Sequence, residues 1–184
     1  MFSSRAYATM ADRGILRPSQ VFCLEAIVKE QSADRAAELV RRCKVAALGT
    51  LHNGAPGVSM VPYAIAQDPF AFIVLVSALS AHTQEMLRAP NVALMIMEPE
   101  TGTKAPHTLA RVSIQGKAEP ISEDHLRFGA ARAAYRARFQ DMVGLFELGD
   151  FSLFEITPTA VRVITGFAQA ASITPASIAR SMRG

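Results

Sequence analysis

The stretch VAALGTLHNGAPGVSMVPYAIA, residues 45–66, decides the fold class of this 184-residue chain. Asn53 and Gly54 both tolerate the positive φ angles of a tight type I′ turn, and apolar runs flank them on either side. The pattern predicts a β-hairpin with a first strand over residues 45–51 and a return strand over residues 57–66. We therefore expect a sheet that is at least partly antiparallel.

Apolar runs of strand length recur further along the chain, separated by turn residues such as Asp68-Pro69. Residues 91–97 are almost wholly apolar, which predicts that this strand is buried on both faces. The expected strands after the hairpin cover residues 70–77, 91–97, 109–118, 151–156 and 160–165, the last two flanking a Thr157-Pro158 turn.

Three helices are expected, one before the strands and two between them, and a serine that can cap an N-terminus precedes each of them. Ser32 opens the first, Ser80 opens a short one that ends near residue 88, and Ser122 opens the third. The third helix is expected to pack through one apolar face, formed by Leu126, Ala130, Ala133, Ala134 and Ala137. The elements predict an α+β, mainly β, fold: a six- or seven-stranded antiparallel β-barrel with a few peripheral helices.

The composition is more hydrophobic than that of a typical soluble protein. Half of the residues are hydrophobic and 19% are charged, against about 25% in typical soluble domains. No uninterrupted apolar run reaches the roughly 18 residues of a membrane-spanning helix, so we expect a large subunit interface instead of a membrane protein. The net charge of +3 is too small to indicate nucleic-acid binding.

We expect an N-terminal arm at residues 1–31, one domain at residues 32–175 and a C-terminal tail at residues 176–184. The first residues lack the apolar region of a secretory signal, which favours a cytoplasmic protein. Cys23 and Cys43 have neither CxxC nor metal-ligand spacing. Free thiols are the favoured interpretation, and a disulfide is the alternative.

The sequence SALSAHT, residues 77–83, joins a strand directly to a helix. Free N–H groups and the positive end of a helix dipole make such a junction suitable for an anion. Ser77, Ser80, Thr83 and the imidazole of His82 could bond a phosphate there. The alternative is that Ser80 only caps the helix while Thr83 packs nearby.

Two strands alternate in a way that gathers polar groups on one face. Arg111, Ser113 and Gln115 share a face that meets either solvent or a ligand, and Ser59, Val61 and Tyr63 share a face of the return strand. The basic segment with Arg127, Arg132, Arg136 and Arg138 is interpreted as a solvated helix face, because no aromatic residues are interleaved for base stacking.

Several motifs taken together resemble the pyridoxamine 5′-phosphate oxidase-like FMN-binding split barrels, and within them the haem-utilisation branch. The resemblance covers about residues 36–174. The motifs are AALGTL at 46–51, VSMVPY at 58–63, VSALSAHTQEML at 76–87, APNV at 89–92, RVSIQG at 111–116, GDFSLF at 149–154 and GFAQA at 166–170.

The resemblance implies a split β-barrel that forms a homodimer with FMN at the subunit interface. It implies that the return strand lines the flavin, that residues 77–83 hold the phosphate, and that Arg111 and Gln115 reach the cofactor bound mainly by the other subunit. The implied FMN-binding residues are Ser59, Met60, Val61, Tyr63, Ser77, Ser80, His82, Thr83, Arg111, Gln115 and Gln169. No metal, nucleic acid or membrane is expected, and the substrate is not specified.

The function expected from the resemblance is a flavin-dependent oxidoreductase, and the alternative is a protein that binds or stores flavin or haem without turnover. His82-Thr83 stands where pyridoxamine-phosphate oxidases have an Arg-Lys pair, which argues against vitamin B6 oxidation. No histidine follows His125, whereas haem-degrading relatives take an iron ligand from their C-terminal region, which argues against haem degradation. No residue is an evident catalytic acid or base.

Overall fold

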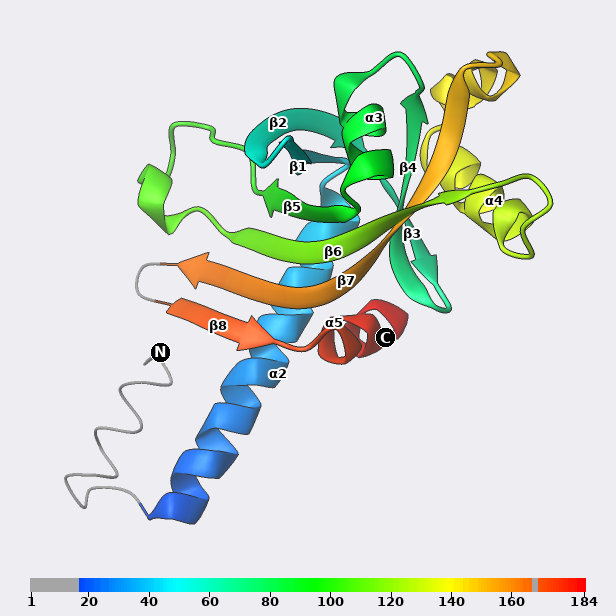
Figure 1. Cartoon of the computed structure of the whole chain (residues 1–184). Helices are drawn as coiled ribbons and strands as arrows, with labels where there is room; N and C mark the ends of the chain where they lie inside the picture. The colour runs from blue at the N-terminus through cyan, green and yellow to red at the C-terminus, as the bar shows by residue number, and fades with distance from the viewer. Residues whose placement is uncertain (1–16, 167–168) are drawn as a thin grey trace. The chain divides into compact units, whose positions relative to one another are not determined.

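The computed structural model of the chain describes residues 17–166 and 169–184. It holds an eight-stranded sheet in the order β2-β1-β5-β6-β7-β4-β3, with β8 paired to β7 (Figure 1). Neighbouring strands pair antiparallel wherever the register is defined, and the described residues add four α-helices. The expected α+β antiparallel fold is confirmed, with one strand more than the sequence predicted.

The chain divides into two compact units. The hairpin unit comprises residues 44–95 and 114–159, and the terminal unit comprises residues 1–43, 96–113 and 160–184. Strands β5 (Asn91–Met97), β6 (Arg111–Ile121) and β7 (Phe151–Gly166) each contribute residues to both units.

The hairpin unit begins with β1 (Val45–His52) and β2 (Ala55–Pro62), paired from Val45 opposite Pro62 to His52 opposite Ala55. The turn between them is the predicted one, since Asn53 and Gly54 have φ angles of 50° and 82°. The return strand is interrupted after Pro62. Its continuation, β3 (Ala64–Gln67), pairs with β4 (Phe70–Ser77) instead of β1.

Helix α3 (Ala81–Arg88) follows Ser80 as expected, but helix α4 (Phe128–Arg138) begins six residues later than predicted, after a run of turns. The predicted apolar face of α4 is wrong. Leu126 is 96% exposed, and the helix buries Ala131 and Tyr135. The reason is bulk, because the Tyr135 ring removes far more surface from water than an alanine face does.

The hairpin unit encloses an apolar core beneath α4 and the 3₁₀-helix η2 (Gln140–Glu147). The Tyr135 ring contacts Phe139 and Phe146, with ring centroids 4.9 and 5.9 Å away. The buried residues of this apolar core are Ala64, Ile73, Leu75, Ile121, Ala131, Tyr135 and Leu153.

The terminal unit is built on helix α2 (Pro18–Arg42), which packs against helix α5 (Pro175–Arg183) and strand β8 (Gln169–Ile173) (Figure 1). Ser32 does not begin this helix. It lies buried within it, and residues 18–31 of the expected arm are helical. Most of the expected C-terminal tail likewise belongs to α5, which buries Ile178 and Met182.

Two strand predictions need correction. In β5 only Val92, Leu94 and Ile96 are buried, and the intervening side chains are exposed, so the strand is not covered on both faces. Strand β7 runs through the predicted Thr157-Pro158 turn without ending. Pro158 is tolerated because it falls between residues 151–156, which pair with β4, and residues 161–166, which pair with β8.

Candidate functional site

An apolar surface lies on one side of the β2-β1-β5 strands, and we call it the outer face: Val45, Ala47, Gly49, Val58, Met60, Ala93 and Met95. The strand register places these residues in rows. Ala47 stands opposite both Met60 and Met95, and Gly49 stands opposite Val58 and Ala93. Val58 is 80% exposed and Met60 63%. Exposed apolar patches of this kind mark ligand or partner surfaces.

The outer face is hollowed beside its second row. A cavity of about 380 Å³ lies against Gly49, Val58 and Ala93, and Gln115 of β6 also lines it. Small side chains form the hollow, because glycine and alanine occupy neighbouring strands at this level. Gln115, expected from the sequence to reach a cofactor, is exposed here with its amide available.

The remaining predicted residues of the return strand lie on the opposite, inner side. Val61 is buried, and Tyr63, just after β2, is buried with its ring edge against Phe72. Ser59 is half-buried, and its Oγ atom is buried without a hydrogen-bond partner among residues 17–166 and 169–184. The structure therefore separates Met60, which is open to a ligand, from Val61 and Tyr63, which belong to the core.

Residues 77–83, which we call the corner, form the predicted junction of β4 and α3. The Ser77 hydroxyl donates a hydrogen bond to Oδ2 of Asp150 and accepts one from the Leu79 N–H at 3.1 Å. Thr83 is buried, and its hydroxyl donates to the Ser77 carbonyl at 2.7 Å. Both hydroxyls are thus engaged within the chain.

The two other predicted residues of the corner differ in character. Ser80 occupies the N-cap position of α3, as expected. Its hydroxyl makes no capping hydrogen bond within the described part of the chain. His82 is half-buried, and this burial lowers the pKa of its imidazole, with Glu85 opposing the shift. A neutral imidazole is therefore favoured at pH 7.

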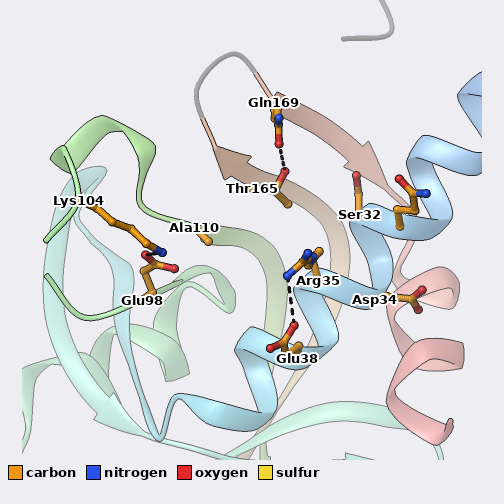
Figure 2. Close-up of a pocket in the computed structure, with 10 residues that line it drawn as sticks. Ser32, Asp34, Arg35, Glu38, Glu98, Lys104, Ala110, Thr165 and Gln169 are labelled. Carbon is orange, nitrogen blue, oxygen red and sulfur yellow. Dashed lines mark hydrogen bonds and ion pairs between the residues drawn. The ribbon is translucent and has the colours of Figure 1, made fainter. Parts of the chain in front are cut away.

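Arg111 and Gln169, the last two predicted residues, belong to the terminal unit. The Arg111 guanidinium donates to the Leu109 carbonyl at 3.1 Å. Gln169 lies opposite Thr165, whose hydroxyl donates to Gln169 Oε1 at 3.1 Å. Gln169 lines a separate cavity of about 700 Å³, where side chains from α2, the loop after β5 and the β7–β8 hairpin surround an open space (Figure 2).

Glu98 is the most enclosed charged group of that cavity. Its carboxylate lies 2.6 Å from the Lys104 ammonium and 3.9 Å from Arg42. The hydrogen bond from Lys104 holds the pKa of the Glu98 carboxyl below its ordinary value. On the opposite wall Arg35 pairs with Glu38 at 3.8 Å, both largely exposed (Figure 2). The charges of this cavity are thus mostly balanced by one another.

The basic segment is not the fully solvated face that the sequence favoured. The Arg132 guanidinium lies 5.3 Å from the Phe146 ring centroid, and that of Arg138 lies 5.1 Å from the Tyr63 ring. Such stacking buries the stems of both side chains. Of the predicted arginines in α4, Arg136 remains exposed.

Asp150 contacts the corner and was not predicted from the sequence. It stands in the quoted GDFSLF motif, but its contact with Ser77 joins residues 73 positions apart. Cys23 and Cys43 form no disulfide in the described part of the chain, and the Cys43 thiol donates to the Met97 carbonyl at 3.4 Å. Within the part of the chain that the structure describes, no helix is long and apolar enough to span a membrane.

Comparisons with known proteins agree with this arrangement. The family model named pyridoxamine 5′-phosphate oxidase matches residues 32–165. The chain is 29% identical over 119 residues to heme oxygenase HutZ of Vibrio cholerae, covering 64% of this chain and 66% of HutZ. It is 34% identical over 120 residues to the chloroplast heme oxygenase HOZ of Arabidopsis thaliana, covering 65% of this chain and 35% of HOZ.

A solved structure of a heme-binding protein from Mycobacterium smegmatis matches with a TM-score of 0.72 at 27% identity, over 81% of this chain and 60% of that one. The chain therefore spans less than two thirds of each of these relatives' own length. The matched residues include the hairpin, the corner and the strand that carries Gln115. The chain belongs to the pyridoxamine 5′-phosphate oxidase family, and the relatives named above are proteins that it resembles.

Proposed function

We propose that this chain binds a flat conjugated cofactor against its outer face and that a second copy of the chain covers the cofactor from the other side. Haem is the first candidate and FMN the second. The observation that carries the proposal is the exposure of Val58 and Met60 beside a hollow of about 380 Å³. Each Å² of apolar surface removed from water contributes about 25 cal/mol, so a broad ring system gains from lying there.

Haem is favoured by the names of the relatives, two heme oxygenases and one heme-binding protein. Its porphyrin presents two large apolar faces, which suit the methionine and valine rows of the outer face. When bound, haem supplies iron-centred redox and oxygen chemistry. Val58 and Met60 would contact the ring, and the Gln115 amide would hydrogen-bond a polar edge group.

FMN is the second candidate because of the family match. When bound, the isoalloxazine supplies the electron-transfer chemistry. The fit of the corner to the phosphate group is limited, because the Ser77 and Thr83 hydroxyls already donate hydrogen bonds to other groups of this chain. Ser80 would be left as the hydroxyl that contacts this cofactor.

The binding test is a titration of the purified protein with hemin and, separately, with FMN, followed by absorbance. Val58→Asp places a charge on the outer face and is expected to weaken binding at least about tenfold, because a charged carboxylate resists burial under a ring. Leu126→Asp is the matched control, since Leu126 is also exposed but lies in the turn that precedes α4 and not on the β2-β1-β5 strands. Equal affinity of wild type and Val58→Asp would contradict the proposal.

The same variants test the homodimer. Light scattering is expected to give twice the chain mass for the wild type and for Leu126→Asp, and a larger monomer fraction for Val58→Asp. A monomeric wild type would contradict the shared site.

Turnover is tested separately from binding. Steady consumption of NADH or NADPH under air by the loaded protein would indicate an oxidoreductase. Stable binding without consumption would indicate a storage or sensing role. No residue of this chain is assigned a catalytic role in either case.

A further inference from the structure

The corner is placed like an anion site, but three of its backbone donors and two of its hydroxyls are already used within the chain, which leaves the Ala81 and His82 N–H groups at the start of α3. A helix N-terminus binds anions through backbone N–H groups that have no partner in the helix. Here the Ala78 N–H donates to the Asp150 carbonyl at 2.7 Å, and the Ser80 N–H donates to the Ser77 carbonyl at 3.1 Å. The Leu79 N–H donates to the Ser77 hydroxyl at 3.1 Å. Three consecutive donors are therefore used within the chain.

The hydroxyls of the corner are engaged in the same way. Ser77 donates to the Asp150 carboxylate, and Thr83 donates to the Ser77 carbonyl. A hydroxyl carries one proton, so neither can donate to an incoming anion without giving up its present acceptor. The Ser80 hydroxyl is the remaining donor of this kind in residues 77–83.

The charges around the corner have the wrong sign for an anion. Residues 77–83 contain no lysine or arginine, and the pKa of His82, lowered by burial, favours the neutral imidazole at pH 7. Asp150 contributes a carboxylate directly at Ser77. Glu85, on the next residues of α3, adds a second, with its side chain 12% exposed. Like charges at such close range oppose each other strongly where solvent is partly excluded.

We propose that Asp150 makes the corner reject anions, so that this chain takes its cofactor without a phosphate contact at residues 77–83. The Asp150 carboxylate holds Ser77, and through Ser77 it occupies the Leu79 N–H. It also places a negative charge directly beside the Ser77 hydroxyl. The inference rests on the proposed function only for the identity of the cofactor, because the corner's selectivity can be measured with a simple anion.

The first experiment titrates the ¹⁵N-labelled wild-type protein with inorganic phosphate and follows the amide resonances of residues 78–83. We expect no saturable shift up to about 10 mM, which corresponds to a binding free energy too weak for a functional site. Asp150→Asn keeps an oxygen that can accept the Ser77 hydroxyl but removes the charge, and it is expected to show saturable shifts with at least about tenfold tighter binding.

Glu123→Gln is the matched control, because it changes the net charge equally at an exposed carboxylate of the same unit. A saturable wild-type response at millimolar phosphate would overturn the proposal, whether or not Asp150→Asn folds. An Asp150→Asn response no larger than that of Glu123→Gln would overturn it as well.

The second experiment compares FMN with riboflavin, which lacks the phosphate, by fluorescence quenching. Wild type is expected to bind FMN no more tightly than riboflavin, and Asp150→Asn is expected to gain affinity for FMN alone. A wild type that prefers FMN at least about tenfold would refute the rejection of anions. If neither flavin binds, FMN fails as a cofactor candidate while the phosphate titration still decides the role of Asp150.

Discussion

The ion pair between Arg127 and Glu155 offers the sharpest test of how the hairpin unit is held together. Glu155 is 4% exposed in the middle of β7, and the Arg127 guanidinium at the start of α4 donates to its carboxylate. Among the described residues, the second hydrogen-bonding contact of this carboxylate is the Thr157 hydroxyl at 3.4 Å, which is too long to be a strong hydrogen bond. Replacing Arg127 therefore leaves a buried charge almost alone.

The size of the effect follows from the two exposures. Losing one partner of a fully buried pair costs about 3–5 kcal/mol, but the Arg127 side chain is 37% exposed and water screens part of the interaction. We expect Arg127→Met to lower the free energy of unfolding by about 2–3 kcal/mol. For a chain of this size that corresponds to a fall in Tm of about 4–12 °C.

The assay is urea-induced unfolding at pH 7, with Arg136→Met as the control because Arg136 is an exposed arginine of the same helix. Arg136→Met is expected to stay within about 0.5 kcal/mol of wild type. The double variant Arg127→Met/Glu155→Gln should recover much of the loss, because the uncompensated charge is gone. A loss below about 0.5 kcal/mol for Arg127→Met would refute the reasoning.

Three further predictions follow from single contacts. Gly116→Ala should cost about 1–3 kcal/mol in urea unfolding, because an added Cβ would lie 2.9 Å from Ile156 Cγ2, whereas Gly129→Ala, which meets nothing within 4 Å, should cost nothing. The pKa of His82 is lowered in the folded protein, so the unfolded chain binds a proton at this imidazole more readily. The free energy of unfolding should therefore fall as the pH drops below about 6.5, and His82→Gln should reduce that loss. An NMR titration that gives His82 a pKa above 6.5 would contradict this. Tyr135→Phe should leave stability unchanged or raise it by about 1 kcal/mol, since the Tyr135 hydroxyl is buried without a hydrogen-bond partner in the described residues; a clear loss in thermal unfolding would show that the hydroxyl is satisfied.

The elements that local chemistry determines could be predicted from the sequence. The hairpin was found because Asn53-Gly54 dictates its own turn, and the corner was found because a strand ends where Ser80 can begin a helix. The start of α2 was missed although Pro18 at the first helical position and Gln20, whose side chain accepts from the Arg17 N–H, are its signals. No side chain of residues 19–31 is buried, so the apolar periodicity there is weak.

Features that depend on distant parts of the chain could not be predicted. The face of α4 depends on which side chains fit over β3 and β4, and composition alone favoured the alanines over Tyr135. The roles of Ser77 and Thr83 depend on Asp150, which is far from both in the sequence. The exposure of Ala93 and Met95 in β5 depends on the outer face having no cover from the described residues of this chain.

The interleaving of the two units has a consequence for synthesis on the ribosome. Helix α2 is made well before β8 and α5, but its apolar residues Ala36 and Val40 are buried in a unit that also needs those two elements. The terminal unit therefore cannot complete its core until β8 and α5 have also left the ribosome. Contacts over such sequence separations slow folding, so α2 is the segment that a chaperone would meet exposed during translation.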